Sequence, residues 1–108
     1  GGEDLAVTFC IATTLDECLS STRYVQFDDE IHLAIYNERY RIPTESSILY
    51  SLDPYGFEKL SDEKLSHLKG VSFSLIKYFE DKKEIVGFLH SLVELCEVAI
   101  KENKNIIA

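Results

Sequence analysis

Cysteine and histidine are the side chains of this sequence best suited to nucleophilic catalysis and metal binding. Cys18, with a histidine from elsewhere in the chain, would supply a nucleophile and its base. No Cys-x-x-Cys or His-x-x-x-His pair is present, and His32, His67 and His90 are scattered, so the usual spacing of zinc ligands is missing. We therefore expect ordinary surface or core side chains at these positions, with no catalytic residue, no metal and no cofactor.

The three cysteines, Cys10, Cys18 and Cys96, are odd in number and far apart. This pattern argues against a closed disulfide framework and is typical of a reducing compartment. The first four residues have neither the basic segment nor the apolar core of a signal peptide. No apolar stretch approaches the roughly 20 residues that cross a bilayer. The sequence predicts a cytoplasmic protein with no membrane partner.

Adjacent carboxylates, in Asp28-Asp29-Glu30 and Asp16-Glu17, are the other groups that could do chemistry. General acid–base pairs need a defined separation and a pocket, whereas neighbouring residues on a turn point in different directions. The loop pattern of an EF-hand is missing, and so is a glycine-rich phosphate loop. We expect these acids to be solvated, and the chain not to be an enzyme.

Charge is the most informative property of the sequence. The net charge is −8, and residues 1–63 hold thirteen acids against four basic residues, whereas residues 64–108 hold seven lysines against six acids. An acidic surface repels nucleic acid and anionic membranes and attracts a cationic partner. The pattern excludes direct nucleic-acid binding and favours a basic macromolecule, to which a row of carboxylates would present the charge pattern of nucleic acid.

Tyrosines share the acidic half of the chain. Tyrosine near carboxylates is typical of surfaces that bind protein partners, where cation–π contacts to lysine and arginine form readily. The alternative is that these rings fill the sheet face beneath the helices. The tyrosines concerned are Tyr24, Tyr36, Tyr40, Tyr50 and Tyr55.

The elements that must position these groups begin with strands. Residues 5–13 are β-branched and aromatic and predict a well-buried strand, and Thr14 with Glu17 predicts a capping box for a short helix over 15–20. Alternating apolar residues predict further strands over 24–27, 30–36 and 39–42, antiparallel because their connections are short. Ile31, Leu33 and Ile35 are the expected covered face.

Helices dominate the remainder. Pro43 ends the sheet, a short helix is expected over 44–52, and residues 53–56 are a turn signal. Apolar stripes from Leu65 to Phe79 and from Ile85 to Ile100 predict two antiparallel helices covering the sheet. Gly70 and Gly87 interrupt these stripes, and close packing of a neighbouring element is the expected reason. Residues 106–108 predict either an edge strand or the start of a further element, and the whole chain, 1–108, is expected to be a single α+β domain.

In size, acidity and α+β layout the chain resembles bacterial toxin-immunity proteins, including those of contact-dependent growth inhibition. The resemblance implies a small cytoplasmic inhibitor that binds and neutralises a basic protein toxin, such as a nuclease. We therefore predict a partner-binding surface from the front-half acids and two tyrosines: Asp28, Asp29, Glu30, Glu38, Glu45, Asp53, Tyr36 and Tyr55.

Two other classes of function remain open. A ligand-binding or enzymatic α+β domain would need convergent polar groups in a pocket between sheet and helices, which Tyr36, His32 and Arg41 could supply. An adaptor module would dimerise through the helices.

Overall fold

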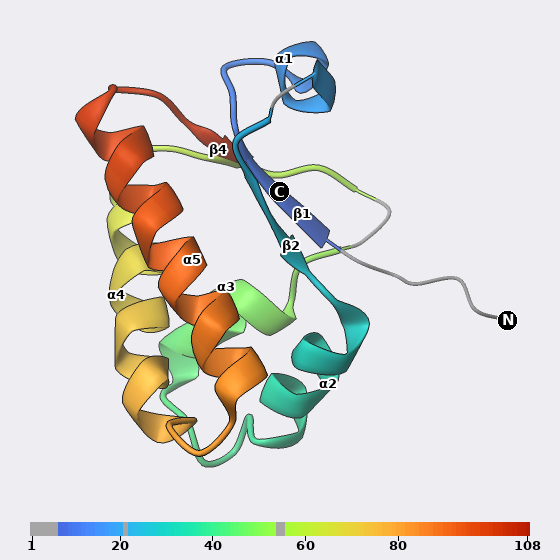
Figure 1. Ribbon diagram of the computed structural model, residues 1–108, viewed down its shortest axis with the longest axis vertical. Helices are drawn as coiled ribbons and strands as arrows, with labels where there is room; N and C mark the ends of the chain where they lie inside the picture. The colour runs from blue at the N-terminus through green and yellow to red at the C-terminus, as the bar shows by residue number, and fades with distance from the viewer. Residues whose placement is uncertain (1–6, 21, 54–55) are drawn as a thin grey trace, which may run out of the picture.

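A four-stranded antiparallel sheet forms one layer of the protein in the computed structural model, which describes residues 7–20, 22–53 and 56–108 (Figure 1). The α+β class and the antiparallel sheet are as predicted, although two of the predicted strands are not part of it. The strands, in the spatial order β2-β1-β4-β3, are β1 (Val7–Ile11), β2 (Tyr24–Phe27), β3 (Lys59–Leu60) and β4 (Ile106–Ile107).

β1 is the best-predicted strand, and it lies inside the sheet between β2 and β4. Val7, Phe9 and Ile11 are buried on one face of the strand, and Cys10 is buried on the other. An inner strand with one buried face and part of the other covered favours β-branched and aromatic side chains, which explains the clear signal, although Thr8 is exposed. Residues 5 and 6 of the predicted strand lie outside the described residues.

The predicted capping box starts helix α1 (Leu15–Ser20). The backbone N–H of Glu17 donates to Oγ1 of Thr14 over 3.2 Å. The carboxylate of Glu17 accepts from the N–H of Thr13 over 3.0 Å, one residue earlier than in the usual box. This bond to the Thr13 backbone lowers the pKa of Glu17.

A disulfide joins Cys10 in β1 to Cys18 in α1, which contradicts the expectation that the cysteines form no disulfide framework, whereas Cys96 is free and buried. Their Cα atoms are 5.6 Å apart, within the range that a disulfide spans. The reason is tertiary: Cys18 packs against the cluster of Cys10, Ala12 and Ile107, which lies apart from the main core. Spacing along the sequence gave no hint of this proximity.

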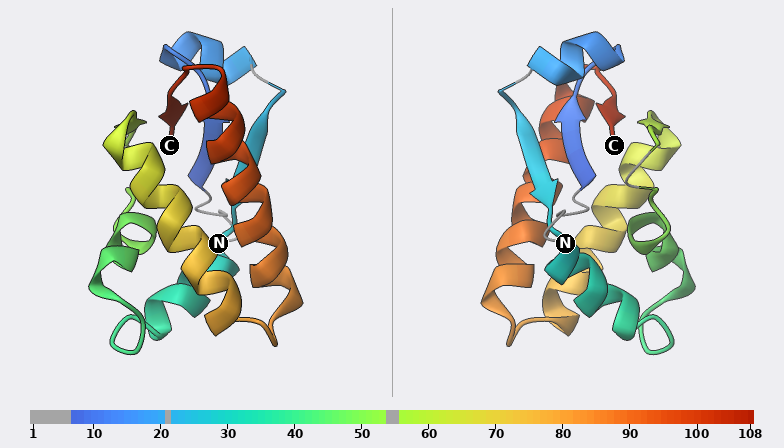
Figure 2. Two further views of the ribbon diagram at one scale, coloured as in Figure 1. Left: turned by 90° about the vertical axis from the view of Figure 1, so that its left-hand side faces the viewer. Right: turned by 90° about the vertical axis from the view of Figure 1, so that its right-hand side faces the viewer.

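Helices α4 (Glu63–Tyr78) and α5 (Lys83–Lys101) run antiparallel, as predicted, with α5 lying against β1 and β2 (Figure 2). The contact is aromatic: the rings of Phe27 and Phe88 stack with centroids 4.6 Å apart, and Phe9 lies within 6.0 Å and 6.4 Å of them. None of the helices in the described ranges has both the length and the apolar character needed to cross a membrane.

The strand predicted over residues 30–36 is wrong, because these residues belong to helix α2 (Asp29–Asn37). Ile31 and Ile35 fit a strand's alternation but are also one helical turn apart, and both pack on the core. Leu33, which only the strand pattern would bury, is 53% exposed. Asp29 and Glu30 in the first turn favour a helix start through the helix dipole.

The strand predicted over residues 39–42 is also wrong. The N–H groups of Arg41 and Ile42 both donate to the carbonyl of Glu38, at 2.8 Å and 3.2 Å, which makes this segment a turn. The short helix expected over 44–52 is present as a 3₁₀ turn, η1 (Thr44–Ser46), followed by α3 (Ser47–Tyr50). The N–H of Gly56 donates to the carbonyl of Asp53 over 3.1 Å, while residues 54 and 55 of the predicted turn lie outside the described residues.

Two-residue strands complete the sheet instead. After α5, Asn103 takes a positive φ of 55°, and its N–H donates to the carbonyl of Ile100 while that of Lys104 donates to Ala99. This is a Schellman ending, which reverses the chain. β4 then enters between β1 and β3, so it is an inner strand and not the predicted edge strand.

Candidate protein-docking site

Three neighbouring carboxylates, those of Asp28, Asp29 and Glu30, are exposed where β2 passes into α2. The backbone holds them there because Phe27, the last residue of β2, is buried against Phe88. Within the described part of the chain, none of the three is paired with a lysine or arginine. They also stabilise the start of α2 through its dipole, but that leaves their charge available to a partner.

A groove runs beside these acids, between β2, the start of α2 and the N-terminal half of α5. Its volume is about 610 Å³, and it continues into a second hollow of about 360 Å³. Tyr24, which is 54% exposed, lies on the β2 side of the groove. The groove is lined by Tyr24, Val25, Gln26, Asp28, Glu30, Ile31, Lys83, Glu84, Gly87, Phe88 and Ser91.

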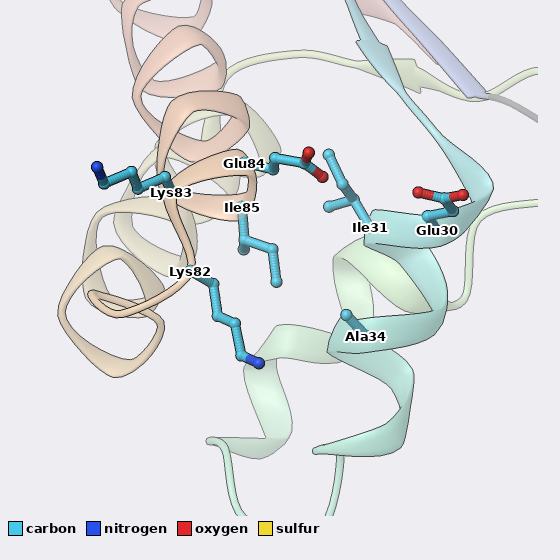
Figure 3. A pocket seen from close by; sticks show the side chains of 7 residues that line it. All are labelled: Glu30, Ile31, Ala34, Lys82, Lys83, Glu84 and Ile85. Atoms are coloured by element: carbon cyan, nitrogen blue, oxygen red, sulfur yellow. The ribbon is translucent and has the colours of Figure 1, made fainter.

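Glu84 adds a fourth carboxylate from the opposite wall of the groove. Figure 3 shows its side chain reaching towards Ile31, whereas the ammonium group of Lys83 points away from α2. Sequence reasoning missed Glu84 because it lies in the half of the chain with balanced charge. Only the α4–α5 hairpin brings it across from α2.

Gly87 is part of the groove wall, and its predicted role in close packing is wrong. A Cβ atom placed at Gly87 would meet no atom within 4 Å outside the helix backbone, and the same holds for Gly70 on α4. A glycine inside a helix costs about 1 kcal/mol relative to alanine. At Gly87 this cost brings no tighter packing; it leaves the groove open.

Glu38, another predicted site residue, is engaged within the chain. It ends α2, accepts a hydrogen bond of 2.8 Å from the hydroxyl of Tyr78, and pairs with Arg41 at 3.5 Å. The bond to Glu38 raises the pKa of Tyr78. Glu38 therefore stabilises the packing of α2 beside α4 and is separated by the length of α2 from Asp28 and Asp29.

Tyr36 lies in an aromatic cluster at the same end of α2. The guanidinium carbon of Arg39 is 3.9 Å from the centre of the Tyr36 ring and 4.5 Å from that of Tyr40. His32 stacks on Tyr36 at 6.4 Å, and Tyr50 meets its edge at 5.8 Å. The cation–π contact that the sequence predicts with a partner is thus made by the chain's own arginine.

The remaining predicted residues lie elsewhere. Glu45, in η1, lines a separate hollow of about 300 Å³ with His67 and Gly70 of α4. Asp53 follows α3, and its carboxylate lies close to Gly56. Tyr55 lies outside the described residues. The structure thus brings Asp28, Asp29 and Glu30 together and leaves Glu38, Glu45 and Asp53 in other places.

The groups suited to catalysis do not converge. A ring nitrogen of His32 is 2.9 Å from the carbonyl of Tyr50, and His67 and His90 are exposed. Burial raises the pKa of the free thiol of Cys96 to about 12, which keeps it protonated. Among the described residues no group of three or more His, Cys, Asp or Glu side chains is placed to hold a metal ion.

Comparison of the chain with protein-family models, with curated proteins and with solved structures finds no match.

Proposed function

We propose that this protein is a non-enzymatic inhibitor that binds a basic protein toxin, in the manner of an immunity protein. The observation that carries the proposal is the set of exposed carboxylates of Asp28, Asp29 and Glu30, which no lysine or arginine of the described ranges pairs with; Asp28 and Glu30 line an open groove together with Glu84. A nuclease presents lysine and arginine to the phosphates of its substrate, and a row of carboxylates fits that surface.

The physical basis of the inhibition is rapid capture. A net charge of −8 attracts a cationic protein over distances near the Debye length, and the clustered carboxylates orient the encounter. Exposed aromatic side chains then slow dissociation, and we assign that role to Tyr24, which is 54% exposed and lines the groove.

The proposal places the protein in the cytoplasm, where a nuclease toxin would reach its substrate. In a reducing compartment Cys10 and Cys18 would be held as thiols. The S–H group of Cys10 would then have an acceptor, because its sulfur is 3.4 Å from the carbonyl oxygen of Ile107. Loss of the disulfide would therefore leave no buried polar group of Cys10 without a partner.

The test uses the gene immediately upstream of the one that encodes this protein, because an immunity protein is encoded beside its toxin. Cells that express the upstream product should stop growing unless this protein is co-expressed, and the two proteins should co-purify. A harmless upstream product, or toxicity that co-expression leaves unchanged, contradicts the proposal.

Charge variants locate the binding surface. The triple variant Asp28→Asn, Asp29→Asn, Glu30→Gln should slow association with the toxin about tenfold or more at low ionic strength and flatten its salt dependence. The matched control, Asp16→Asn, Glu80→Gln, Glu94→Gln, removes the same charge from exposed positions elsewhere. Equal slowing by both triples in stopped-flow mixing would mean that only net charge matters.

A further inference from the structure

Among the strands of residues 7–20, 22–53 and 56–108, β2 lies at an edge of the sheet, and one of its sides has no neighbouring strand there. Its pairing with β1 has the register Phe9↔Val25 and Thr8↔Gln26. The N–H of Ile11 donates to the carbonyl of Arg23, so the odd-numbered residues of this segment carry the bonds to β1. Backbone groups alternate along an antiparallel strand, so those of Tyr24 and Gln26 face the open side.

The outward backbone groups of Tyr24 and Gln26 make no hydrogen bond within the described chain. An edge of this kind is a template for another strand, and proteins usually block it with a lysine, a proline or a bulge. β2 has none of these between Tyr24 and Phe27. Its four residues are about 13 Å long, enough to bond both outward residues to one added strand.

The groove supplies the space that an added strand would fill. Gly87 and Ser91, one turn apart on α5, line it beside the β2 edge. A side chain at position 87 would project into open space, since a Cβ atom there meets nothing within 4 Å. Gly87 therefore leaves this space open, whereas a larger side chain at the same position would project into it.

Charge selects the occupant of the edge. The carboxylates of Asp28, Glu30 and Glu84 border the groove, and the ammonium group of Lys83 is directed away from α2 (Figure 3). An extended segment with lysine or arginine therefore fits, because its cationic side chains reach these acids. A second copy of the chain fits less well, since each copy carries a net charge of −8.

We infer that an extended, basic segment of the partner protein adds to β2 as a fifth strand of the sheet. The inference deepens the proposed function and rests on it for the identity of the partner. Backbone bonds to Tyr24 and Gln26 fix the register, and Asp28, Glu30 and Glu84 select positive side chains.

The first test needs no toxin, because the probe is a synthetic peptide of alternating lysine and valine, six residues long and blocked at both ends. At saturation we expect hydrogen exchange of the Tyr24 and Gln26 amides to slow at least tenfold, with matching shifts in the amide NMR spectrum. The Val25 amide, already turned towards β1, is the internal control and should change little. No response at millimolar peptide overturns the inference.

Two further peptides separate strand addition from simple charge attraction. The first is the lysine peptide N-methylated at alternate residues, prepared in two forms that are methylated at the odd or at the even positions. Each form keeps its charge and loses half of its backbone donors. The second carries glutamate in place of lysine. Both should bind at least tenfold more weakly than the lysine peptide. A methylated peptide that binds as tightly as its parent, in both registers, overturns strand addition.

Variants on α5 give an independent test of the groove. Gly87→Gln places a side chain in the groove and should weaken binding of the lysine peptide tenfold or more. Gly70→Gln makes the same change on α4, away from β2, and should leave binding within twofold. Circular dichroism confirms that both variants fold, and equal binding by both rejects the groove as the site.

These outcomes keep the inference and the proposed function apart. Protection of the Tyr24 and Gln26 amides with no toxin neutralised in cells would leave the edge site standing and reject the inhibitor role. Neutralisation of a toxin that Gly87→Gln leaves unchanged would support the inhibitor role and overturn strand addition.

Discussion

The two edges of the sheet differ in what they offer to another chain. On β2, Tyr24 and Gln26 turn their backbone groups outward, beside a groove bordered by acids. On β3, Glu58 exchanges both backbone hydrogen bonds with Ala108, at 2.7 Å and 2.9 Å, so only Lys59 of the two-residue strand faces outward. One edge is longer and acidic, and the other is minimal and carries a lysine.

The comparison indicates which edge is protected. A very short strand and an edge lysine are two of the means by which proteins prevent unwanted strand pairing, and β3 has both. β2 has neither, and the acids that follow it repel other acidic surfaces while they admit basic ones. The sheet is therefore blocked at β3 and selective at β2, and the packing and pairing around β2 keep it in that state.

Truncating Phe27, whose buried ring holds β2 against α5, should have the largest effect on stability. Phe27 is 1% exposed and stacks on Phe88, so Phe27→Ala is expected to lower the free energy of unfolding by about 3–5 kcal/mol. The measurement is the midpoint of urea unfolding. Phe73→Ala is the control, because Phe73 is 68% exposed on α4 and should cost no more than about 0.5 kcal/mol. Similar losses in both variants would mean that the Phe27–Phe88 stack is not what anchors β2.

The disulfide should have the next largest effect, because it fixes α1, which leads from β1 into β2. Cys10 and Cys18 are separated by 8 in sequence, and closing so short a loop is worth about 2–3 kcal/mol through the unfolded state. Adding a reductant should lower the urea midpoint accordingly. In the variant Cys10→Ala, Cys18→Ala the reductant should change nothing. A wild-type midpoint that does not respond to reductant contradicts this account.

Elements with strong local patterns could be predicted from the sequence. Four of the five residues of β1 are buried and the strand is rich in β-branched and aromatic side chains, while α5 buries one continuous apolar stripe, so each element has a clear pattern in the sequence. α2 could not be assigned, because Ile31 and Ile35 satisfy both periods and only the exposure of Leu33 decides between them. β3 is too short to show any period, and β4 is expected only at an edge, because tertiary pairing decides where such two-residue strands lie.

The candidate site could be predicted in part, because only some of its residues are neighbours in the sequence. Asp28, Asp29 and Glu30 are contiguous, so their clustering is readable from the sequence. Glu84 comes from a distant helix, and Gly87 becomes informative only once the space around it is known. A run of adjacent charged residues can be recognised from the sequence, whereas a groove forms only when distant elements pack together.

Alanine at the two helical glycines should give a smaller change, opposite in sign. Gly87→Ala and Gly70→Ala are each expected to raise the free energy of unfolding by about 1 kcal/mol, because neither new methyl group meets an atom within 4 Å. Thermal and urea unfolding measure the gain. A destabilised Gly87→Ala beside a stabilised Gly70→Ala would mean that the groove along β2 is filled in the free protein, and the contrast between the two edges would be lost.

The ion pair that precedes β2 should have the smallest effect, confined to acid pH. Arg23 donates to Glu102 over 2.6 Å, and this bond lowers the pKa of Glu102. Because the folded pKa lies below the unfolded one, the stabilisation is complete above the ordinary glutamate value of about 4.3 and is lost as the pH falls through the folded value.

Glu102→Gln should therefore make the loss of stability below about pH 4.3 shallower and leave its pH dependence near neutrality unchanged, whereas Glu94→Gln, at an exposed position on α5, should keep the wild-type profile. The pair is exposed on both sides, so the difference is small. Identical acid profiles for all three proteins would mean that the pair does not hold this end of β2. The stack of Phe27 on Phe88 and the bonds to β1 would then fix the strand alone, and its outward groups would remain open at any pH at which the core is intact.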